Sequence, residues 1–203
     1  MKVVVRIKYL SAFVLLAAAA SVSATVPTPN KTLKNLQAAY DGESNAHAKY
    51  LEFAKQADRE GYGKAASLFR AAAAAEQIHG ACEAAVIKRM AATPQAELKL
   101  PPIKSTKQNL EESANKGEAY ERDTMYPRFI RQADKDANKA AARCFAYASS
   151  AEAEHFKLFT AAANDLDKMK GRPAIYYVCS EDGYTMAKLN AGKCPGGEYQ
   201  EVR

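Results

Sequence analysis

Four glutamates and two histidines are spaced in this sequence as two Glu-x-x-His pairs, each following a Gly-Glu dipeptide, and a fifth glutamate lies three residues after the second Gly-Glu. These residues are Glu43, Glu76, His79, Glu118, Glu121, Glu152 and His155. Residues three apart on a helix share one face, so each pair presents a carboxylate and an imidazole to the same point. One glutamate from each of two helices, with a Glu-x-x-His from each of two others, is the ligand set of di-iron and di-manganese four-helix bundles. The spacing therefore predicts a bundle with a two-metal site in its core.

Cations are needed if these side chains are to be buried together. Carboxylates a few ångströms apart cannot all ionise in a poorly solvated interior, so their pKa values would rise. Two divalent ions bring four positive charges against the five glutamates and nearly neutralise the set. Oxygen and imidazole ligands without thiolate suit iron, manganese or zinc, and the ligand types alone do not choose among these metals.

The spacing also assigns roles to the ligands. Glu76 and Glu152 each begin a Glu-x-x-His pair, which makes them the natural bridging ligands between two metals. His79 and His155 would each complete the coordination of one metal. The terminal ligands, one from each half of the chain, would be Glu43 and Glu118.

The seventh member of the set and three residues near the set have different roles. Glu121 is an additional carboxylate, because the first half of the chain has Ala46 at the equivalent position. It would give one metal a choice of ligand as the charge of that metal changes. Tyr50 and Tyr126 fall on the ligand-bearing faces, where their hydroxyls can bond to the carboxylates. His47 is better explained as a neighbour of the ligands or as a surface residue than as a further ligand.

Helical periodicity predicts an all-α fold with four helices and one long crossover. Apolar residues recur at helical spacing in segments that are bounded by capping residues, glycines and prolines. The predicted helices cover approximately residues 32–60, 62–90, 105–134 and 137–170, and the crossover covers residues 91–104. Pro127 lies inside the third helix, where the missing backbone donor predicts a kink or bulge.

The two halves of the bundle resemble each other in sequence. The segment Lys55–Asp58 (KQAD) corresponds to Arg131–Asp134 (RQAD), at the same distance before the following Glu-x-x-His. The second half holds one extra residue between its Gly-Glu and this segment. A π-bulge near Pro127 would absorb that residue without losing the register of the ligands. The duplication predicts pseudo-two-fold symmetry, with one metal served mainly by each half.

The N-terminus reads as a signal peptide. Lys2, Arg6 and Lys8 precede an apolar run from Leu10 to Ala20, and small residues follow up to Ala24. The run is short for a transmembrane span, although an uncleaved anchor is the competing interpretation. We expect residues 1–24 to be removed, residues 25–170 to form the bundle and residues 171–203 to form a tail. The mature protein would be periplasmic and would not be bound to the membrane.

Charge and cysteine content limit the possible partners. Cleavage removes three positive charges, so the formal net charge falls from +6 to +3. The chain lacks a dense basic patch interleaved with aromatic residues, which argues against nucleic acid as a partner. All four cysteines lie in the exported part, where disulfides persist. Cys82 and Cys144 fall inside helical segments and are first interpreted as small buried apolar residues.

Four segments of the sequence resemble the rubrerythrins. They are Asp41–Tyr50 (DGESNAHAKY), Ala75–His79 (AEQIH), Gly117–Pro127 (GEAYERDTMYP) and Ala151–His155 (AEAEH). The resemblance implies a ferritin-like four-helix bundle, assembly into a homodimer, and two iron ions that reduce hydrogen peroxide to water. It also implies that the seven residues above are the ligands, and that Glu121 exchanges with His79 at one iron. Tyr50 and Tyr126 match tyrosines that lie beside the metal ligands in that family.

The C-terminal tail departs from the family pattern. Rubrerythrins typically end in a rubredoxin-like module, in which two Cys-x-x-Cys pairs hold one iron. Here Cys179 and Cys194 keep that layout, but Asp182 and Gly197 replace the second cysteine of each pair. Two thiolates are too few for a four-sulfur iron centre. We interpret the tail as a degenerate rubredoxin-like β-hairpin, with a Cys179–Cys194 disulfide favoured over a mixed-ligand metal site that uses Asp182.

Three functions are compatible with these features. The first is an exported di-iron peroxidase that acts in oxidative-stress defence with an unidentified electron donor. The second is a ferroxidase or iron-handling protein, which uses the same ligands and requires no dedicated donor. The third is a non-catalytic bundle that binds a metal such as zinc and acts as a binding or sensing module.

Overall fold

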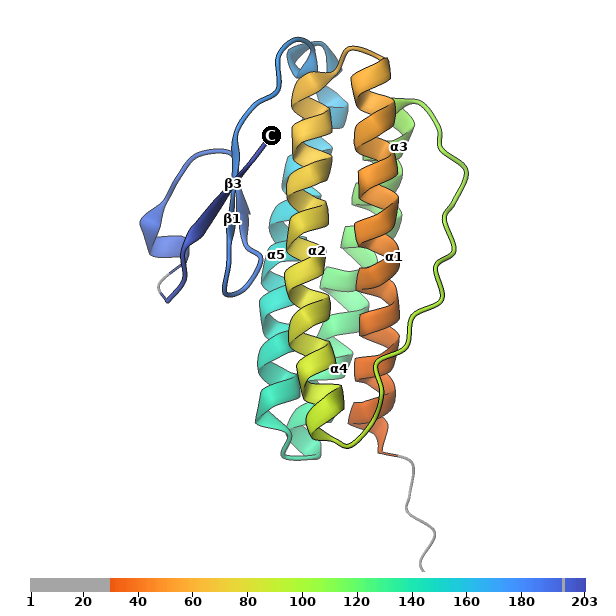
Figure 1. Cartoon of the computed structure of the whole chain (residues 1–203), viewed down its shortest axis with the longest axis vertical. Coiled ribbons are helices and arrows are strands. Elements are labelled where there is room, and N and C mark those ends of the chain that lie inside the picture. Colours follow the sequence, from red (N-terminus) through yellow and green to blue (C-terminus); the bar gives the residue numbers. More distant parts are fainter. Residues whose placement is uncertain (1–29, 195) are drawn as a thin grey trace, which may run out of the picture.

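The computed structural model describes residues 30–194 and 196–203, so the expected signal peptide lies outside the described residues. A bundle of long helices carries a small β-sheet on one side (Figure 1). Helix α1 (Lys31–Arg59) begins after Asn30, whose side-chain oxygen accepts a hydrogen bond from the Leu33 backbone N–H. A tight turn at Gly61, where φ is +80°, leads into α2 (Gly63–Arg89). Both helices match the predicted segments closely.

The crossover between the two halves runs as an extended segment along the outside of α1 (Figure 1). Three polar side chains of α1 fix its backbone. The Gln37 amide donates to the carbonyl of Thr93 at 2.7 Å, and Asp41 accepts from the Glu97 N–H at 2.7 Å. Asn45 accepts from the backbone N–H of Lys99 at 2.6 Å. A segment without helical period is thus held in place by side chain–backbone hydrogen bonds.

The third helical stretch contains more π-helix than the sequence analysis predicted. It consists of α3 (Thr106–Glu112), the π-helices η1 (Ser113–Glu118) and η2 (Glu121–Met125), and α4 (Tyr126–Lys135). Helix η2 lies between Glu118 and Gln132 and accounts for the extra residue of the second half. The prediction of a π-bulge is confirmed, but both π-helices precede Pro127. That proline lies in the first turn of α4, where a missing N–H is easily tolerated.

The last long helix, α5 (Lys139–Asn164), is shorter than predicted. Asn138 caps it by accepting from the Ala141 N–H at 3.0 Å. The predicted end at residue 170 is wrong, because Asp165 leaves the helical conformation with φ −133° and ψ 65°. A short 3₁₀ segment, η3 (Leu166–Met169), occupies the remainder of that range. Asn and Asp compete for backbone hydrogen bonds, which explains why the helix ends at this pair.

The tail forms a three-stranded antiparallel sheet in which β1 is central. The strands are β1 (Tyr176–Cys179), β2 (Thr185–Met186) and β3 (Tyr199–Val202), in the order β2-β1-β3, and a 3₁₀ turn η4 (Ala191–Lys193) precedes β3. The predicted hairpin corresponds to β1 and β2, whereas the third strand was not predicted. Figure 1 shows the sheet beside α2 and α5, and Val178 and Thr185 are fully buried against the bundle.

Two apolar clusters fill the bundle, and the ligand positions lie between them. The first contains Tyr50, Phe53, Phe69 and Phe159, and the second contains Tyr126, Phe129 and Phe145. Equivalent residues of the two halves repeat the same contacts. The ring centroids of Tyr50 and Phe69 are 6.0 Å apart, as are those of Tyr126 and Phe145. The internal duplication therefore has a physical counterpart in the packing.

A disulfide joins Cys82 on α2 to Cys144 on α5, with their Cα atoms 5.7 Å apart. Cys144 is buried in the second apolar cluster and Cys82 packs against it, as expected, but the bond between them was not predicted. Their bonding depends on which helix faces touch, and the spacing along the chain does not report that. Cys179 and Cys194 also form a disulfide, which agrees with the sequence prediction. Among the described helices, none combines the length and the apolar character needed to cross a membrane.

Removing the helix–helix disulfide should destabilise the bundle. Replacing Cys82 and Cys144 by alanine is expected to lower the free energy of unfolding by about 2–4 kcal/mol, because the bond closes a long loop in the unfolded chain. Urea unfolding followed by circular dichroism measures this loss. The control is the Cys179→Ala/Cys194→Ala variant, which opens a much shorter loop in the tail. Equal unfolding midpoints for the wild type and the helix–helix variant would show that the bond does not stabilise the bundle.

Candidate metal centre

Six of the seven predicted ligands lie around one point of the bundle, and Glu121 lies near them. Helix α1 provides Glu43, α2 provides Glu76 and His79, the π-helices provide Glu118 and Glu121, and α5 provides Glu152 and His155. Six of them form two groups of four whose ligand atoms lie within 4.8 Å of one another: Glu43, Glu76, His79 and Glu152, and Glu76, Glu118, Glu152 and His155. Glu76 and Glu152 belong to both groups, which is the geometry that bridging ligands require.

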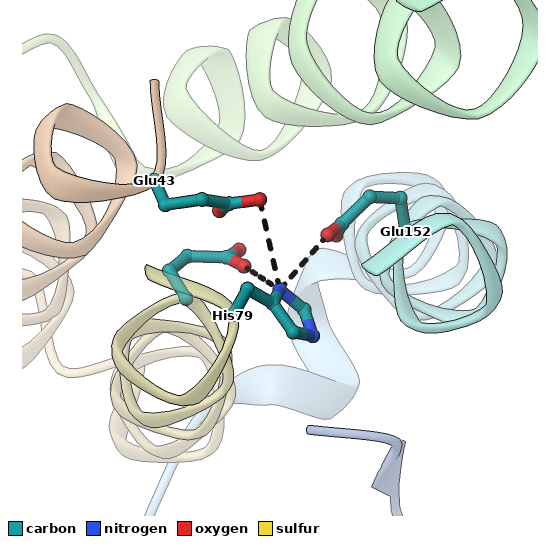
Figure 2. A group of neighbouring side chains, drawn as sticks. Glu43, His79 and Glu152 are labelled. Carbon is teal, nitrogen blue, oxygen red and sulfur yellow. Dashed lines mark hydrogen bonds and ion pairs between the residues drawn. The ribbon is translucent and has the colours of Figure 1, made fainter. Parts of the chain in front are cut away.

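Figure 2 shows the first group, in which Nδ1 of His79 points at surrounding carboxylates. This nitrogen lies 3.0 Å from Oε2 of Glu76, 3.2 Å from Oε1 of Glu152 and 3.8 Å from Oε1 of Glu43. Burial alone would lower the pKa of His79. The negative charges of Glu152 and of the other carboxylates outweigh burial and raise that pKa well above its usual range.

The second group repeats this arrangement around His155. Its Nδ1 lies 2.8 Å from Oε2 of Glu152, 3.4 Å from Oε1 of Glu76 and 3.7 Å from Oε2 of Glu118. Burial alone would lower the pKa of His155. The negative charges of Glu76 and Glu152 outweigh burial and raise that pKa well above its usual range. Each imidazole thus lies where a cation would balance the carboxylates.

Two tyrosines connect the halves of the site. The hydroxyl of Tyr50 donates to Oε1 of Glu118, and that of Tyr126 donates to Oε1 of Glu43. Each tyrosine therefore orients a glutamate of the opposite half. Burial raises the pKa of both hydroxyls well above the usual value, and the charges of Glu118 and Glu43 respectively add to this effect. Both tyrosines, singled out from their spacing, lie beside the predicted ligands.

Glu121 lies at the start of η2 and belongs to neither group of four. Its side chain keeps partial solvent exposure. Burial by the surrounding protein and the charges of Glu118 and Glu43 nevertheless raise its pKa well above the usual value. Glu121 is therefore close to the other carboxylates without being fixed among them. Its role as an exchanging ligand stays a prediction.

The tail supplies hydrogen-bond partners to both histidines on the side away from the carboxylates. Nε2 of His79 lies 3.0 Å from the carbonyl oxygen of Asp182, which can only accept. Nε2 of His155 lies 3.0 Å from Oγ1 of Thr185, whose own proton goes to the carbonyl of Gly183. Both histidines must therefore donate from Nε2, which leaves Nδ1 as the atom that faces the site.

The turn between β1 and β2 fits closely against the bundle at Gly183. This glycine has φ +73°, and an added Cβ would collide with Nε2 of His79 and approach the carbonyl oxygen of Ala75 to 3.2 Å. Only glycine satisfies both the backbone conformation and the close contact. This contact could not be predicted from the sequence, because it joins residues more than a hundred positions apart.

The electrostatics of the site fit divalent cations. Burial and the charge of Glu76 raise the pKa of Glu43, and burial with the charges of Glu76 and Glu118 raises the pKa of Glu152 to about 8. Among the described residues, Oε2 of Glu118 and Oε1 of Glu152 are buried without a hydrogen-bond partner. Buried carboxylate oxygens without partners are costly in protein alone and are satisfied when they ligate a metal. The residues present therefore suit a two-metal centre.

Glu83 is a buried carboxyl that the sequence analysis missed. It is fully buried on α2, and Tyr126 Oη lies 3.5 Å from its Oε1. Burial and the charge of Glu43 raise its pKa well above the usual value. Its position seven residues after Glu76 places it on the same helix face, and this spacing was the available signal. The equivalent residue of the second half is Phe159, so the duplication is not exact at this point.

His47 lies outside both ligand groups, as expected. Its Nδ1 is 2.7 Å from the carbonyl oxygen of Ala73, which ties the imidazole to α2.

The metal-free protein should lose stability as the pH rises from about 5 to about 8. The Glu152 carboxyl titrates near pH 8 when folded and near its usual ~4.3 when unfolded, so the folded state holds an extra proton between these values. Stability then falls with rising pH, and the raised pKa values of His79 and His155 act in the same direction. A loss of about 2 kcal/mol would lower Tm by about 4–8 °C. Thermal unfolding of chelator-treated protein at both pH values tests this, with zinc-loaded protein as the control. A Tm that rises with pH would contradict it.

Comparison with known proteins agrees with this geometry. The family model of the rubrerythrins matches residues 34–163. Nigerythrin of Nitratidesulfovibrio vulgaris is 41% identical over 165 residues, which is 81% of this chain and 80% of that protein. Rubrerythrin-2 of Clostridium acetobutylicum is 33% identical over 163 residues, or 79% of this chain and 88% of that protein.

Solved structures give the same result. The fully reduced, all-ferrous state of nigerythrin superposes with a TM-score of 0.71 at 39% identity, covering 81% of this chain and 80% of that one. A bacterioferritin of Desulfovibrio desulfuricans has a TM-score of 0.64 at 22% identity, covering 70% and 88%, and supports the ferritin-like fold alone. From the matched residues and the ligand arrangement, we conclude that the chain belongs to the rubrerythrin family.

Proposed function

We propose that this protein is an exported di-iron peroxidase that reduces hydrogen peroxide to water in oxidative-stress defence. A di-iron centre is the cofactor expected for the family, and the carboxylate and histidine groups of this chain can bind it. The observation that carries the proposal is the pair of four-ligand groups that share Glu76 and Glu152. Adjacent metals that share ligands are suited to a reaction that needs two electrons at one place.

The iron ions would supply the electrons for cleavage of the peroxide bond. The surrounding side chains orient the metal ligands before the reaction begins. The Tyr50 hydroxyl donates a hydrogen bond to Oε1 of Glu118, which fixes the orientation of this carboxylate. Oε2 of Glu118 is left without a partner at the centre of the site. The hydroxyls of Tyr50 and Tyr126 keep their protons, because burial raises their pKa values. Together with the apolar clusters on either side, these contacts keep Glu118 and Glu152 away from bulk water.

The proposed reaction needs electrons from outside the chain. In the tail, both sulfurs that could serve as thiolate ligands are joined in the Cys179–Cys194 disulfide. This supports the interpretation of the tail as a rubredoxin-like module without its iron. We therefore propose an external electron donor, a homodimeric assembly and a periplasmic location. Residues 1–24, on which the location rests, lie outside the described residues.

The second candidate is a ferroxidase that oxidises Fe(II) and passes it on. The disulfide in the tail favours this alternative, because a ferroxidase needs no internal electron relay. A non-catalytic bundle that binds zinc is the third candidate. Steady-state consumption of hydrogen peroxide, measured with an added reductant, distinguishes these functions. Sustained turnover supports the peroxidase, net Fe(II) oxidation without sustained turnover supports the ferroxidase, and redox-silent zinc in protein from its native compartment supports the third.

Replacing Glu121 by alanine should separate metal binding from turnover. The two groups of four lack this residue, so metal content should be unchanged. Peroxide turnover should fall about 100-fold, the scale associated with losing one positioned catalytic group. Asp123→Ala, which removes an exposed acid of the same π-helix, serves as the matched control. Unchanged turnover in Glu121→Ala would refute the ligand-exchange role.

A further inference from the structure

A pocket of about 400 Å³ lies between α1 and α2 and reaches the metal centre. Glu43 and Glu76 form its floor, each with 2% of its surface exposed. Leu98 of the crossover lies at its rim and is 61% exposed. The pocket therefore leads from the surface to two ligands of the first metal group. Glu118 and Glu152 do not line this pocket.

Small residues keep this pocket open. Gly80 has an ordinary helical φ, so its backbone does not require glycine. A glycine inside a helix costs about 0.5–1 kcal/mol relative to alanine. An added Cβ would lie 3.6 Å from Cβ of Glu43 and 3.8 Å from the ring of Tyr40, within the space that the pocket occupies. Ala48 and Ala84 line the walls. Larger side chains at these positions would fill the pocket.

The rim is held in place from both sides of Leu98. The Glu97 N–H donates to Asp41 at 2.7 Å, and the Lys99 N–H donates to Asn45 at 2.6 Å. Asn45 also donates to the carbonyl of Glu97 at 3.0 Å. These bonds fix the backbone on each side of Leu98, so that an apolar side chain lies beside the entrance instead of moving freely with the crossover.

The size and lining of the pocket indicate what it binds. Hydrogen peroxide has only two heavy atoms, whereas about 400 Å³ is in the range of pockets that enclose small organic molecules. Most of the lining is apolar and includes the Tyr40 ring, alanine methyl groups and Leu98. The polar groups of the lining are Ser44, His47 and Gln77, together with the two metal ligands at the floor. A ligand that matches this change from apolar walls to a polar floor has an apolar substituent at one end. Its other end carries a group that reacts at the metals.

We infer that this pocket is a binding site for organic hydroperoxides, and that the protein reduces them to alcohols. This inference rests on the proposed peroxidase function and extends its substrate class. The overall reaction is ROOH + 2 e⁻ + 2 H⁺ → ROH + H₂O. The O–O bond breaks, and the electrons come from the reductant that the proposed peroxidase already requires. The apolar group R lies against Tyr40, Ala48, Ala84 and Leu98, while the hydroperoxide group faces Glu43 and Glu76.

Binding can be measured without turnover by using zinc-loaded protein and 2-phenyl-2-propanol, the alcohol product of cumene hydroperoxide. An NMR titration should show saturable binding to the wild type. Ala84→Phe fills the pocket and should weaken binding about tenfold or more, since the lost apolar contacts are worth at least ~1.4 kcal/mol. The matched control is Ala85→Phe on the adjacent, exposed position of α2. Leu98→Ser changes only the exposed rim and should also weaken binding, even if Ala84→Phe folds poorly.

Reaction is tested with reduced, iron-loaded protein in a stopped-flow instrument. Cumene hydroperoxide should oxidise the wild type rapidly, and Ala84→Phe should slow this reaction about tenfold more than it slows the reaction with hydrogen peroxide. Wild-type protein that reacts with hydrogen peroxide but neither binds the alcohol nor reacts with cumene hydroperoxide overturns this inference alone. Wild-type protein that reacts with neither peroxide overturns the proposed function, and this inference with it.

Discussion

Glu152→Gln should abolish the two-metal centre while leaving the bundle folded. Glu152 belongs to both ligand groups, and its two oxygens lie 3.2 Å and 2.8 Å from Nδ1 of His79 and His155. Glutamine keeps the shape of the side chain but removes the charge that both metals would share. We expect the metal content to fall from two ions per chain to one or none, and peroxide turnover to fall at least about 100-fold.

The same substitution should have the opposite effect on the metal-free protein. Burial and neighbouring charges raise the pKa of Glu152 to about 8, so its carboxylate destabilises the metal-free bundle at alkaline pH. At pH 8 the metal-free variant should be about 1–2 kcal/mol more stable than the metal-free wild type. Metal analysis and urea unfolding measure both effects, with the surface substitution Glu111→Gln as the control. A variant that retains two metals and full turnover would rule out a shared role for Glu152.

Gly183→Ala should displace the tail from the metal centre. The new methyl group would collide with Nε2 of His79 at a backbone position where φ is +73°. His79 would then lose the Asp182 carbonyl that holds its Nε2 proton. Removing such a partner typically weakens metal affinity about 10–100-fold. Competition with a chromophoric chelator measures the affinity, and protection of the tail from proteolysis reports whether it still docks.

Gly61→Ala separates backbone strain from the collision. Gly61 has a similar φ of +80°, but no atom lies within 4 Å of the added Cβ. This variant should lose some stability and keep the wild-type metal affinity. Thr185→Val tests the other histidine, because it removes the hydroxyl that accepts from His155 with little change of shape. If Gly183→Ala and Thr185→Val both bind metal as tightly as the wild type, the tail does not position the histidines.

The ligand set could be predicted because local rules determine it. Residues three apart on a helix share a face, and clustered carboxylates require compensation by cations, so Glu76, His79, Glu152 and His155 follow from spacing and charge. Tyr50 and Tyr126 followed from the same helix geometry. The length of the crossover and one extra residue in the second half were also enough to predict the bundle topology and a π-bulge.

Contacts between distant segments could not be predicted in the same way. The Cys82–Cys144 bond depends on the relative rotation of α2 and α5, which an alanine-rich sequence leaves open. The hydrogen bonds from Asp182 and Thr185 to the histidines depend on where the tail docks. The spacing of Glu83 from Glu76 placed it on the ligand-bearing face, but its contact with Tyr126 crosses the bundle and could not be predicted from that spacing.

The most direct test of the two-metal site is the metal content of the purified protein, followed by an anaerobic peroxide titration of its reduced form. Protein from an exported, metal-replete preparation should contain two irons per chain, and about one hydrogen peroxide per site should oxidise them, as followed by visible absorption. Zinc in place of iron, or less than one metal per chain with no response to peroxide, would contradict the di-iron peroxidase and favour a metal-binding module.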